Sequence, residues 1–232
     1  MLAQLLKYSD KSFITLTNNL CDVGRGCSIE SVHKLRLTIK KLHTLLGIFN
    51  YKEEIPAIKK SIKVIDRIFI LSGLIRDNQV QIGLLKKYRN RIGEAIDFTI
   101  ISLMNDNKKY KETIRLKIKR INPFDLVLLN QRIDNRIEAL NDSSIYSILQ
   151  EKADELFDQM NLIIRNNPDE KALHRIRIML KELIYTLSII KKGKGKSKLE
   201  KSALTYLEYL QQVLGDWHDL KVLLDRVNCI KV

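Results

Sequence analysis

The chain has 232 residues, of which 45% are hydrophobic and 29% are charged, and its formal net charge at pH 7 is +14. A chain of this length can bury a core without disulfides or metals, and no stretch approaches the apolar run that a transmembrane helix needs. The N-terminal segment lacks the succession of basic, apolar and small residues that marks a signal peptide. The three cysteines form no CxxC pair, which argues against a disulfide framework and a zinc site. We therefore expect a cytoplasmic protein that does not enter a membrane.

The spacing of the apolar residues predicts an all-α fold. Leu, Lys and Glu recur with helical rather than alternating spacing, and only three prolines interrupt them. Two glycines in "CDVGRGCS" end the first predicted helix, and Ser28 then caps the helix that carries His33. Gly73 stands between two further helices, which are nearly continuous through it. The predicted helices of the first half cover residues 2–20, 28–50, 57–71 and 75–91, with more helical segments over 92–120.

Asn122 and Pro123 mark the best candidate boundary between two halves, because proline disfavours a helical conformation in the residue before it. Predicted helices then cover residues 124–140 and 144–166, and a further helix starts at Pro168 or Asp169 and carries His174. The run "KKGKGKSK" is predicted as a loop, and helices over 199–214 and 217–227 follow it.

The two histidine-bearing segments are near-copies of each other. Moving the second half back by 141 positions places His174 on His33, and with one inserted residue Gly215 falls on Gly73. The other matched pairs include Arg177 with Arg36, Lys181 with Lys40, His218 with Arg76, Asp219 with Asp77, and Lys201 with Lys59. A period of about 140 residues favours duplication of domain-sized halves over a solenoid. We predict one domain over 1–232, with repeats over about 1–121 and about 122–232.

On a helix, each copy separates a basic face from an apolar face. At about 100° per residue, the basic residues of each copy lie within roughly 60°. They are His33, Arg36 and Lys40 in the first copy and His174, Arg177 and Lys181 in the second. An ordinary amphipathic surface helix is the alternative interpretation, but such helices usually mix charges to form pairs at i and i+4. Neither basic face contains an acid at these positions.

This chemistry fits phosphate. Arginine offers a planar fork to two oxygens, lysine a mobile charge, and histidine a donor that gains charge beside an anion. If the halves pack around a pseudo-twofold axis, the basic faces would line a groove whose like charges repel one another until an anion enters. Arg76 and His218 occupy matching positions, and Lys59 and Lys201 are weaker candidates.

Asp77 and Asp219 follow the matched Arg76 and His218 directly in the sequence. We expect them either to orient neighbouring basic side chains or to cap a helix. Equally, they are ordinary acids near helix N-termini, where a negative charge interacts favourably with the helix dipole.

Two other functions stay open. The "HD" at His218 and Asp219 is a feature of metal-dependent HD-type phosphohydrolases, but the counterpart of His218 is Arg76, and arginine does not ligate divalent metals. The second alternative is nonspecific nucleic-acid binding through charge. Single-strand binding surfaces interleave aromatic and basic residues, whereas neither basic face contains an aromatic. We expect no catalytic residue, metal or cofactor.

Together these segments resemble the CHAD domain, the conserved histidine α-helical domain, over nearly the whole chain. "VHKLRLTIKKL" is similar to the family's first HxxR helix, and "LHRIRIMLKELIYTL" is similar to the second. "LEYLQQVLGDWHDLKVL" resembles the closing signature. The resemblance implies two pseudo-symmetric four-helix halves in one bundle, which bind inorganic polyphosphate in a central basic groove or pore without catalysis, and it makes an association with polyphosphate granules conceivable.

The polyphosphate-binding residues that we predict are His33, Arg36, Lys40, Lys41, Lys59, Arg76, His174, Arg177, Lys181, Lys201 and His218. Lys41 joins this set through the family's first basic motif. The second copy departs from the family pattern in having Glu182 where a basic residue is frequent and Ile184 where arginine precedes Tyr185.

Overall fold

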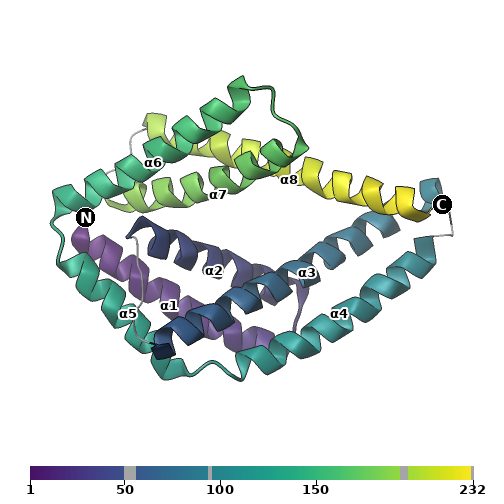
Figure 1. Cartoon of the computed structure of the whole chain (residues 1–232), viewed down its shortest axis with the longest axis horizontal. Helices are drawn as coiled ribbons and strands as arrows, with labels where there is room; N and C mark the ends of the chain where they lie inside the picture. Colours follow the sequence, from purple (N-terminus) through teal and green to yellow (C-terminus); the bar gives the residue numbers. More distant parts are fainter. Residues whose placement is uncertain (50–55, 94–95, 194–197, 231–232) are drawn as a thin grey trace. The chain divides into compact units, whose positions relative to one another are not determined.

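The computed structural model describes residues 1–49, 56–93, 96–193 and 198–230. Within these ranges the chain forms eight α-helices and no strand (Figure 1), which confirms the all-α prediction. The helices are α1 (Leu2–Arg25), α2 (Ile29–Ile48), α3 (Pro56–Ile92), α4 (Ile96–Ile118), α5 (Pro123–Glu138), α6 (Asp142–Arg165), α7 (Glu170–Gly193) and α8 (Lys198–Ile230). None of these helices is both long enough and apolar enough to cross a bilayer.

Several helices begin where a polar side chain caps them. The Oγ atom of Ser28 accepts a hydrogen bond of 3.0 Å from the backbone N–H of Ser31, as the sequence predicted for the start of α2. Asp169 caps α7 in the same way, with Oδ1 2.7 Å from the backbone nitrogen of Ala172. Asn141 caps α6 through a bond of 2.8 Å from the N–H of Ser144. Since α2 and α7 carry the repeated motif, these caps fix where each basic face begins.

The sequence predicted two helices that are nearly continuous through Gly73, and the structure has one unbroken helix there. The break predicted between residues 214 and 217 is wrong. Helix α3 continues through Gly73 for 37 residues, and α8 continues through Gly215 for 33 residues. A helical glycine costs about 1 kcal/mol relative to alanine, which the surrounding helix tolerates. The segment "YKEEIP" at residues 51–56, where we predict a turn, lies outside the described residues except for Pro56, and so does the part of "KKGKGKSK" at 194–197.

The chain divides into two compact units. Unit 1 comprises Met1–Ser12, Lys41–Lys52 and Asn130–His218, and unit 2 comprises Phe13–Lys40, Glu53–Leu129 and Asp219–Val232. Helices α3 and α4 therefore belong to unit 2, and α6 and α7 belong to unit 1. The remaining helices, α1, α2, α5 and α8, contribute residues to both. The repeat boundaries near residue 121 stay a prediction.

In unit 1, α6 packs against α7. Their shared core contains Leu156 and Met160 from α6 and Ile176, Leu180 and Leu183 from α7. Partly buried leucines of α8 cover this core. The chain start is fixed to the same unit, because the terminal ammonium group lies 2.9 Å from the carboxylate of Asp142.

In unit 2, α3 packs against α4. Leu85 from α3, Ile96, Ile100 and Leu103 from α4, and Leu223 from α8 form a buried cluster. Helix α2 is held to α1 by a buried hydrogen bond of 2.8 Å from Asn19 Nδ2 to Thr38 Oγ1. On the same helix, Leu35 and Ile39 are fully buried, so that the opposite, polar side of α2 is left for other groups.

Candidate anion-binding site

The two faces predicted for α2 are present. Leu35 and Ile39 are fully buried, and Leu42 is 2% exposed. On the other face His33 is exposed, and Arg36 is partly buried. The same division holds for α7, where Ile176, Leu180 and Leu183 are buried in the core of unit 1, whereas His174, Arg177 and Lys181 are only partly buried. Each copy of the motif therefore presents its basic residues away from the apolar core.

Arg36 has a structural contact as well as a charge. Its Nη1 atom donates a hydrogen bond of 2.9 Å to the carbonyl oxygen of Phe69 and lies 3.4 Å from Ser72 Oγ. The guanidinium carbon is 4.7 Å from the centroid of the Phe69 ring, within the range of a cation–π interaction. A β-carbon at Gly73 would come 2.8 Å from Nη1. Glycine at this position therefore makes room for the arginine that ties α2 to α3.

His33 lies among cations. Although His33 is exposed, partial desolvation of its imidazole lowers the pKa below the usual 6.5, and the positive charges of Arg76, Lys40 and Arg36 lower it further. Arg76 therefore reaches from α3 to the basic face of α2. We call His33, Arg36, Lys40 and Arg76 the α2 basic cluster. All four residues belong to unit 2, and their mutual repulsion favours an anion between them.

Two of the corresponding residues of unit 1, His174 and His218, also lie side by side. The rings of His174 on α7 and His218 on α8 have centroids 4.9 Å apart and are tilted by 46°. On α7, the Nε atom of Arg177 is buried without a hydrogen-bond partner among the described residues. We call His174, Arg177, Lys181 and His218 the α7 basic cluster. The repeat matched Arg76 with His218. In each unit, this matched residue of the long helix lies beside the motif histidine: Arg76 near His33, and His218 near His174.

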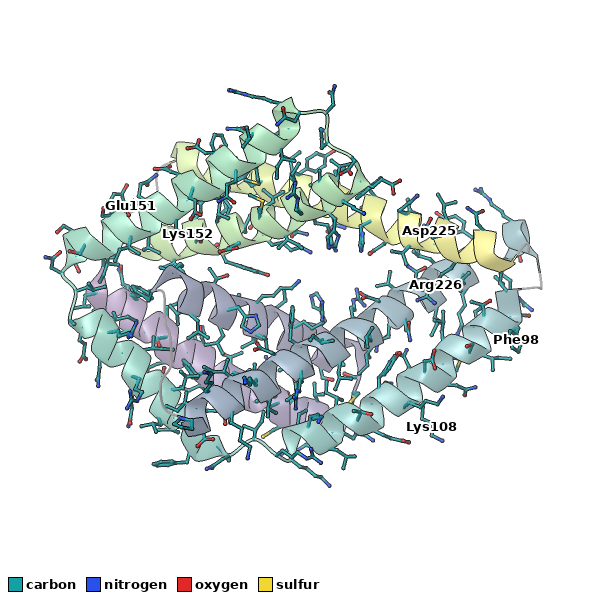
Figure 2. The ribbon with its side chains drawn as sticks, in the orientation of Figure 1. Phe98, Lys108, Glu151, Lys152, Asp225 and Arg226 are labelled. Carbon is teal, nitrogen blue, oxygen red and sulfur yellow. The ribbon has the colours of Figure 1, made fainter. Side chains whose placement is uncertain are left out.

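The two departures from the family pattern have local explanations. The carboxylate of Glu182 lies 3.6 Å from the Nζ atom of Lys152, which extends from α6 (Figure 2). Its negative charge is therefore partly offset. Ile184 is 8% exposed and belongs to the apolar core of unit 1, so a charged residue there would need to leave the core. The sequence alone did not indicate Lys152, because it lies outside both motifs.

The other predicted residues are not in these clusters. Lys41 is exposed and belongs to unit 1. Lys59 is exposed near the start of α3, about 25 Å along the helix axis from Arg76 at 1.5 Å per residue. The side chain of Lys201 lies outside the described residues. A single groove lined by both clusters stays a prediction.

The suggestion that Asp77 and Asp219 stand near helix N-termini is wrong. Asp77 lies far inside α3 and Asp219 far inside α8, because neither helix ends at its glycine. The backbone oxygen of Asp219 accepts a hydrogen bond of 3.2 Å from Gln81 Nε2, which joins α8 to α3 within unit 2. In the part of the chain that the structure describes, no group of three or more His, Cys, Asp or Glu residues is arranged to hold a metal ion.

Comparison with known proteins agrees with the motifs. No curated protein matches the chain significantly. Among solved structures, the chain is similar to the crystal structure of the CHAD domain from the plant Ricinus communis, with a TM-score of 0.76 and 19% sequence identity. That match covers 96% of this chain and 76% of the other, and at this identity it shows the fold. The family model of the CHAD domain matches residues 9–228. Because this match spans most of the sequence, the chain belongs to the CHAD domain family.

Proposed function

We propose that this protein binds inorganic polyphosphate through the α2 and α7 basic clusters, without a catalytic step. The observation that carries the proposal is the setting of His33, whose pKa is lowered by partial desolvation and then by three neighbouring cations. Three cations close enough to depress a histidine pKa destabilise one another. A bound anion relieves this repulsion, and this relief makes the free energy of binding more favourable.

A chain of phosphates fits better than a single phosphate. Within each cluster, the motif histidine and the lysine seven residues later are about 10 Å apart along the helix. Successive phosphate groups can therefore meet successive side chains, as Arg177 and Lys181 follow His174 along α7. Arg36 offers fewer donors than Arg177, since its Nη1 already binds Phe69. We accordingly expect Lys40 and Arg76 to contribute most in the α2 basic cluster.

Isothermal titration with long-chain polyphosphate, and with orthophosphate in parallel, tests the proposal. We expect polyphosphate to bind much more tightly than orthophosphate, with an affinity that falls steeply as salt rises, by analogy with counterion release from nucleic acids. The informative variants are K40Q/R76Q in the α2 basic cluster and R177Q/K181Q in the α7 basic cluster. Each double variant should reduce the affinity for polyphosphate at least tenfold. Each should also make the affinity depend less steeply on salt concentration.

The matched control is K63Q/R67Q on α3. Both residues are exposed, and at about 100° per residue they lie roughly 140–180° around the helix from Arg76. This control removes the same number of positive charges, both from the helix that carries Arg76, and should retain most of the affinity. Equal losses in the control and in the cluster variants would mean that only net charge matters. Equal affinity for polyphosphate and a mixed RNA oligomer at physiological salt would instead favour general polyanion binding.

A further inference from the structure

Helix α4 carries a feature that the two basic clusters do not explain. Its buried stripe consists of Ile96, Ile100, Leu103, Asn107 and Ile114. Asn107 is the polar member of this stripe, and it is only 7% exposed. Its Oδ1 atom has no hydrogen-bond partner among the described residues. A buried amide oxygen without a partner destabilises the folded state, so an apolar residue at this position would stabilise the fold better.

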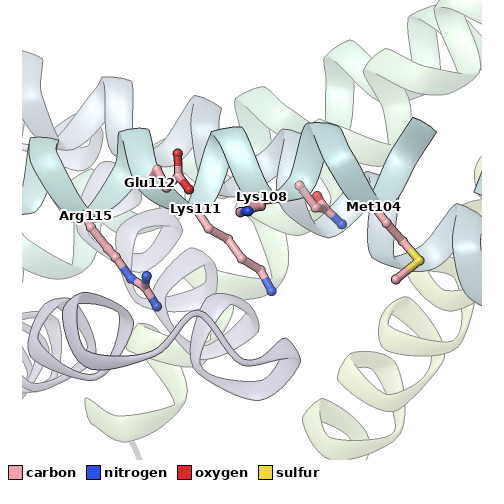
Figure 3. Close-up of a pocket in the computed structure, with 6 residues that line it drawn as sticks. Met104, Lys108, Lys111, Glu112 and Arg115 are labelled. Atoms are coloured by element: carbon pink, nitrogen blue, oxygen red, sulfur yellow. The ribbon is translucent and has the colours of Figure 1, made fainter. Parts of the chain in front are cut away.

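A cavity of about 340 Å³ lies beside Asn107. Its lining consists of Met104, Asn107, Lys108, Lys111, Glu112 and Arg115. Figure 3 shows the side chains of Met104, Lys111 and Arg115 extending from the same side of α4, with the carboxylate of Glu112 directed away from them. Three cations against one carboxylate leave two positive charges in the lining.

Two of these cations lie close to the turn that follows α1. The Nε atom of Arg115 is buried without a hydrogen-bond partner in the described part of the chain. Cys27, in the turn that follows α1, is buried, and this burial raises the pKa of its thiol, while the nearby charges of Arg115 and Lys111 act in the opposite direction. The turn therefore lies beside both basic side chains. All of these residues belong to unit 2.

We propose that this α4 cavity is a second anion-binding site, distinct from the two basic clusters, which takes a compact diphosphate. The charge of the lining matches an anion with two or more negative charges. Lys108 and Arg115 are about 10 Å apart along the helix axis, a separation that two linked phosphates span more readily than one. The cavity volume is roughly ten times the share of one water molecule in the liquid, so a single phosphate would leave most of it to solvent. A protonated phosphate oxygen can donate to Asn107 Oδ1, which accounts for the polar residue in the buried stripe.

The test uses the full chain with pyrophosphate as the probe. Hydrogen exchange followed by mass spectrometry should show saturable protection of the α4 peptide around residues 104–115. Lys111→Gln with Arg115→Gln should abolish this protection. The control K119Q/R120Q removes the same charge from two exposed residues just beyond α4, and should keep it. A further variant, Asn107→Leu, replaces the unpartnered amide with an apolar side chain and should remove protection without loss of stability.

These outcomes are separable from long-chain polyphosphate binding. The variant K40Q/R76Q should retain the pyrophosphate protection on α4, even though it loses affinity for polyphosphate. Absence of saturable protection on α4 in the unmodified chain would overturn the second site, as would equal protection in the unmodified chain and in K111Q/R115Q. Neither result bears on the α2 and α7 basic clusters.

Discussion

Arg36 on α2 and Gly73 on α3 form a complementary pair. The guanidinium Nη1 atom lies 2.9 Å from the carbonyl oxygen of Phe69, and a side chain at position 73 would collide with it, since a β-carbon there would be 2.8 Å away. The arginine of the first HxxR segment therefore fixes α2 to α3 as well as contributing charge. In unit 1, Gly215 has no such neighbour, so the two copies of the motif are not equivalent.

Arg36→Lys should destabilise the protein although it keeps the charge. Lysine cannot reproduce both the hydrogen bond to Phe69 and the planar contact with its ring. We expect the free energy of unfolding to fall by about 1–3 kcal/mol, from the lost charged hydrogen bond and cation–π contact. Urea denaturation measures this change. Arg177→Lys is the comparison, and it should lose less. Equal losses in the two variants would remove the distinction between the copies.

Gly73→Ala should bring no gain in stability, unlike the same change elsewhere in α3. Alanine in a helix interior is favoured over glycine by about 1 kcal/mol, but at position 73 the new methyl group displaces the Arg36 guanidinium. Gly83→Ala is the matched control, because Gly83 lies on the same helix and a β-carbon added there would meet nothing within 4 Å. Thermal unfolding should show G83A stabilised and G73A unchanged or less stable.

The coupling between the two residues can be measured directly. In an Arg36→Gln background the shorter side chain no longer reaches position 73, so G73A should then gain about as much stability as G83A. A double-mutant cycle that gives no interaction free energy between positions 36 and 73 would contradict the contact.

His33 should make the stability of the free protein depend on pH. Its folded-state pKa is lowered below the usual 6.5 by partial desolvation and by neighbouring cations. At a pH just below 6.5, the native state therefore binds fewer protons than the unfolded state. The free energy of unfolding should fall as the pH drops through the unfolded-state pKa of His33. It should level off below the folded-state pKa. Denaturation of the unmodified chain and of His33→Gln between pH 8 and pH 5 tests this. The variant should lose the part of the pH dependence that comes from His33.

Bound polyphosphate should shift the pKa of His33 in the opposite direction to the neighbouring cations. A bound anion beside His33 favours the imidazolium form and raises the pKa, so affinity should increase as pH falls through the histidine range. Proton NMR titration of the imidazole, with and without polyphosphate, measures the shift. An unchanged His33 pKa in the saturated complex is incompatible with phosphate contact in the α2 basic cluster.

The sequence predicted the helical class, the cap at Ser28, the helix start near Asp169 and the opposite faces of α2 and α7, because these depend on local spacing and hydrogen bonding. It predicted near-continuity through Gly73 but missed the continuity of α8 through Gly215. It also missed the reason for glycine at position 73, which makes room for a contact with α2 that no local pattern reveals. It also missed the Asn107 cavity, because α4 has no counterpart in the repeat that would draw attention to it. Contacts between distant segments, such as Lys152 with Glu182, are not visible in the spacing of either segment.

Removal of the Glu182 charge should strengthen polyphosphate binding by the α7 basic cluster. The carboxylate lies next to Lys181 in the chain and is only partly offset by Lys152, at 3.6 Å. Glu182→Gln should raise the affinity by about two- to fivefold, in the range of exposed charge interactions. Lys152→Gln should lower it, because Glu182 then loses its cation. The double variant K152Q/E182Q should lie between the two, and isothermal titration at fixed salt measures all three.

Glu155→Gln supplies the control for these variants. Glu155 also contacts Lys152, at 3.1 Å, but it lies on α6 and outside the α7 basic cluster. Its removal makes the same change in net charge as E182Q and leaves Lys152 next to Glu182. We expect E155Q to bind polyphosphate with nearly unchanged affinity. If E155Q and E182Q increase the affinity equally, the effect comes from total charge, and Glu182 has no particular place beside the bound phosphate.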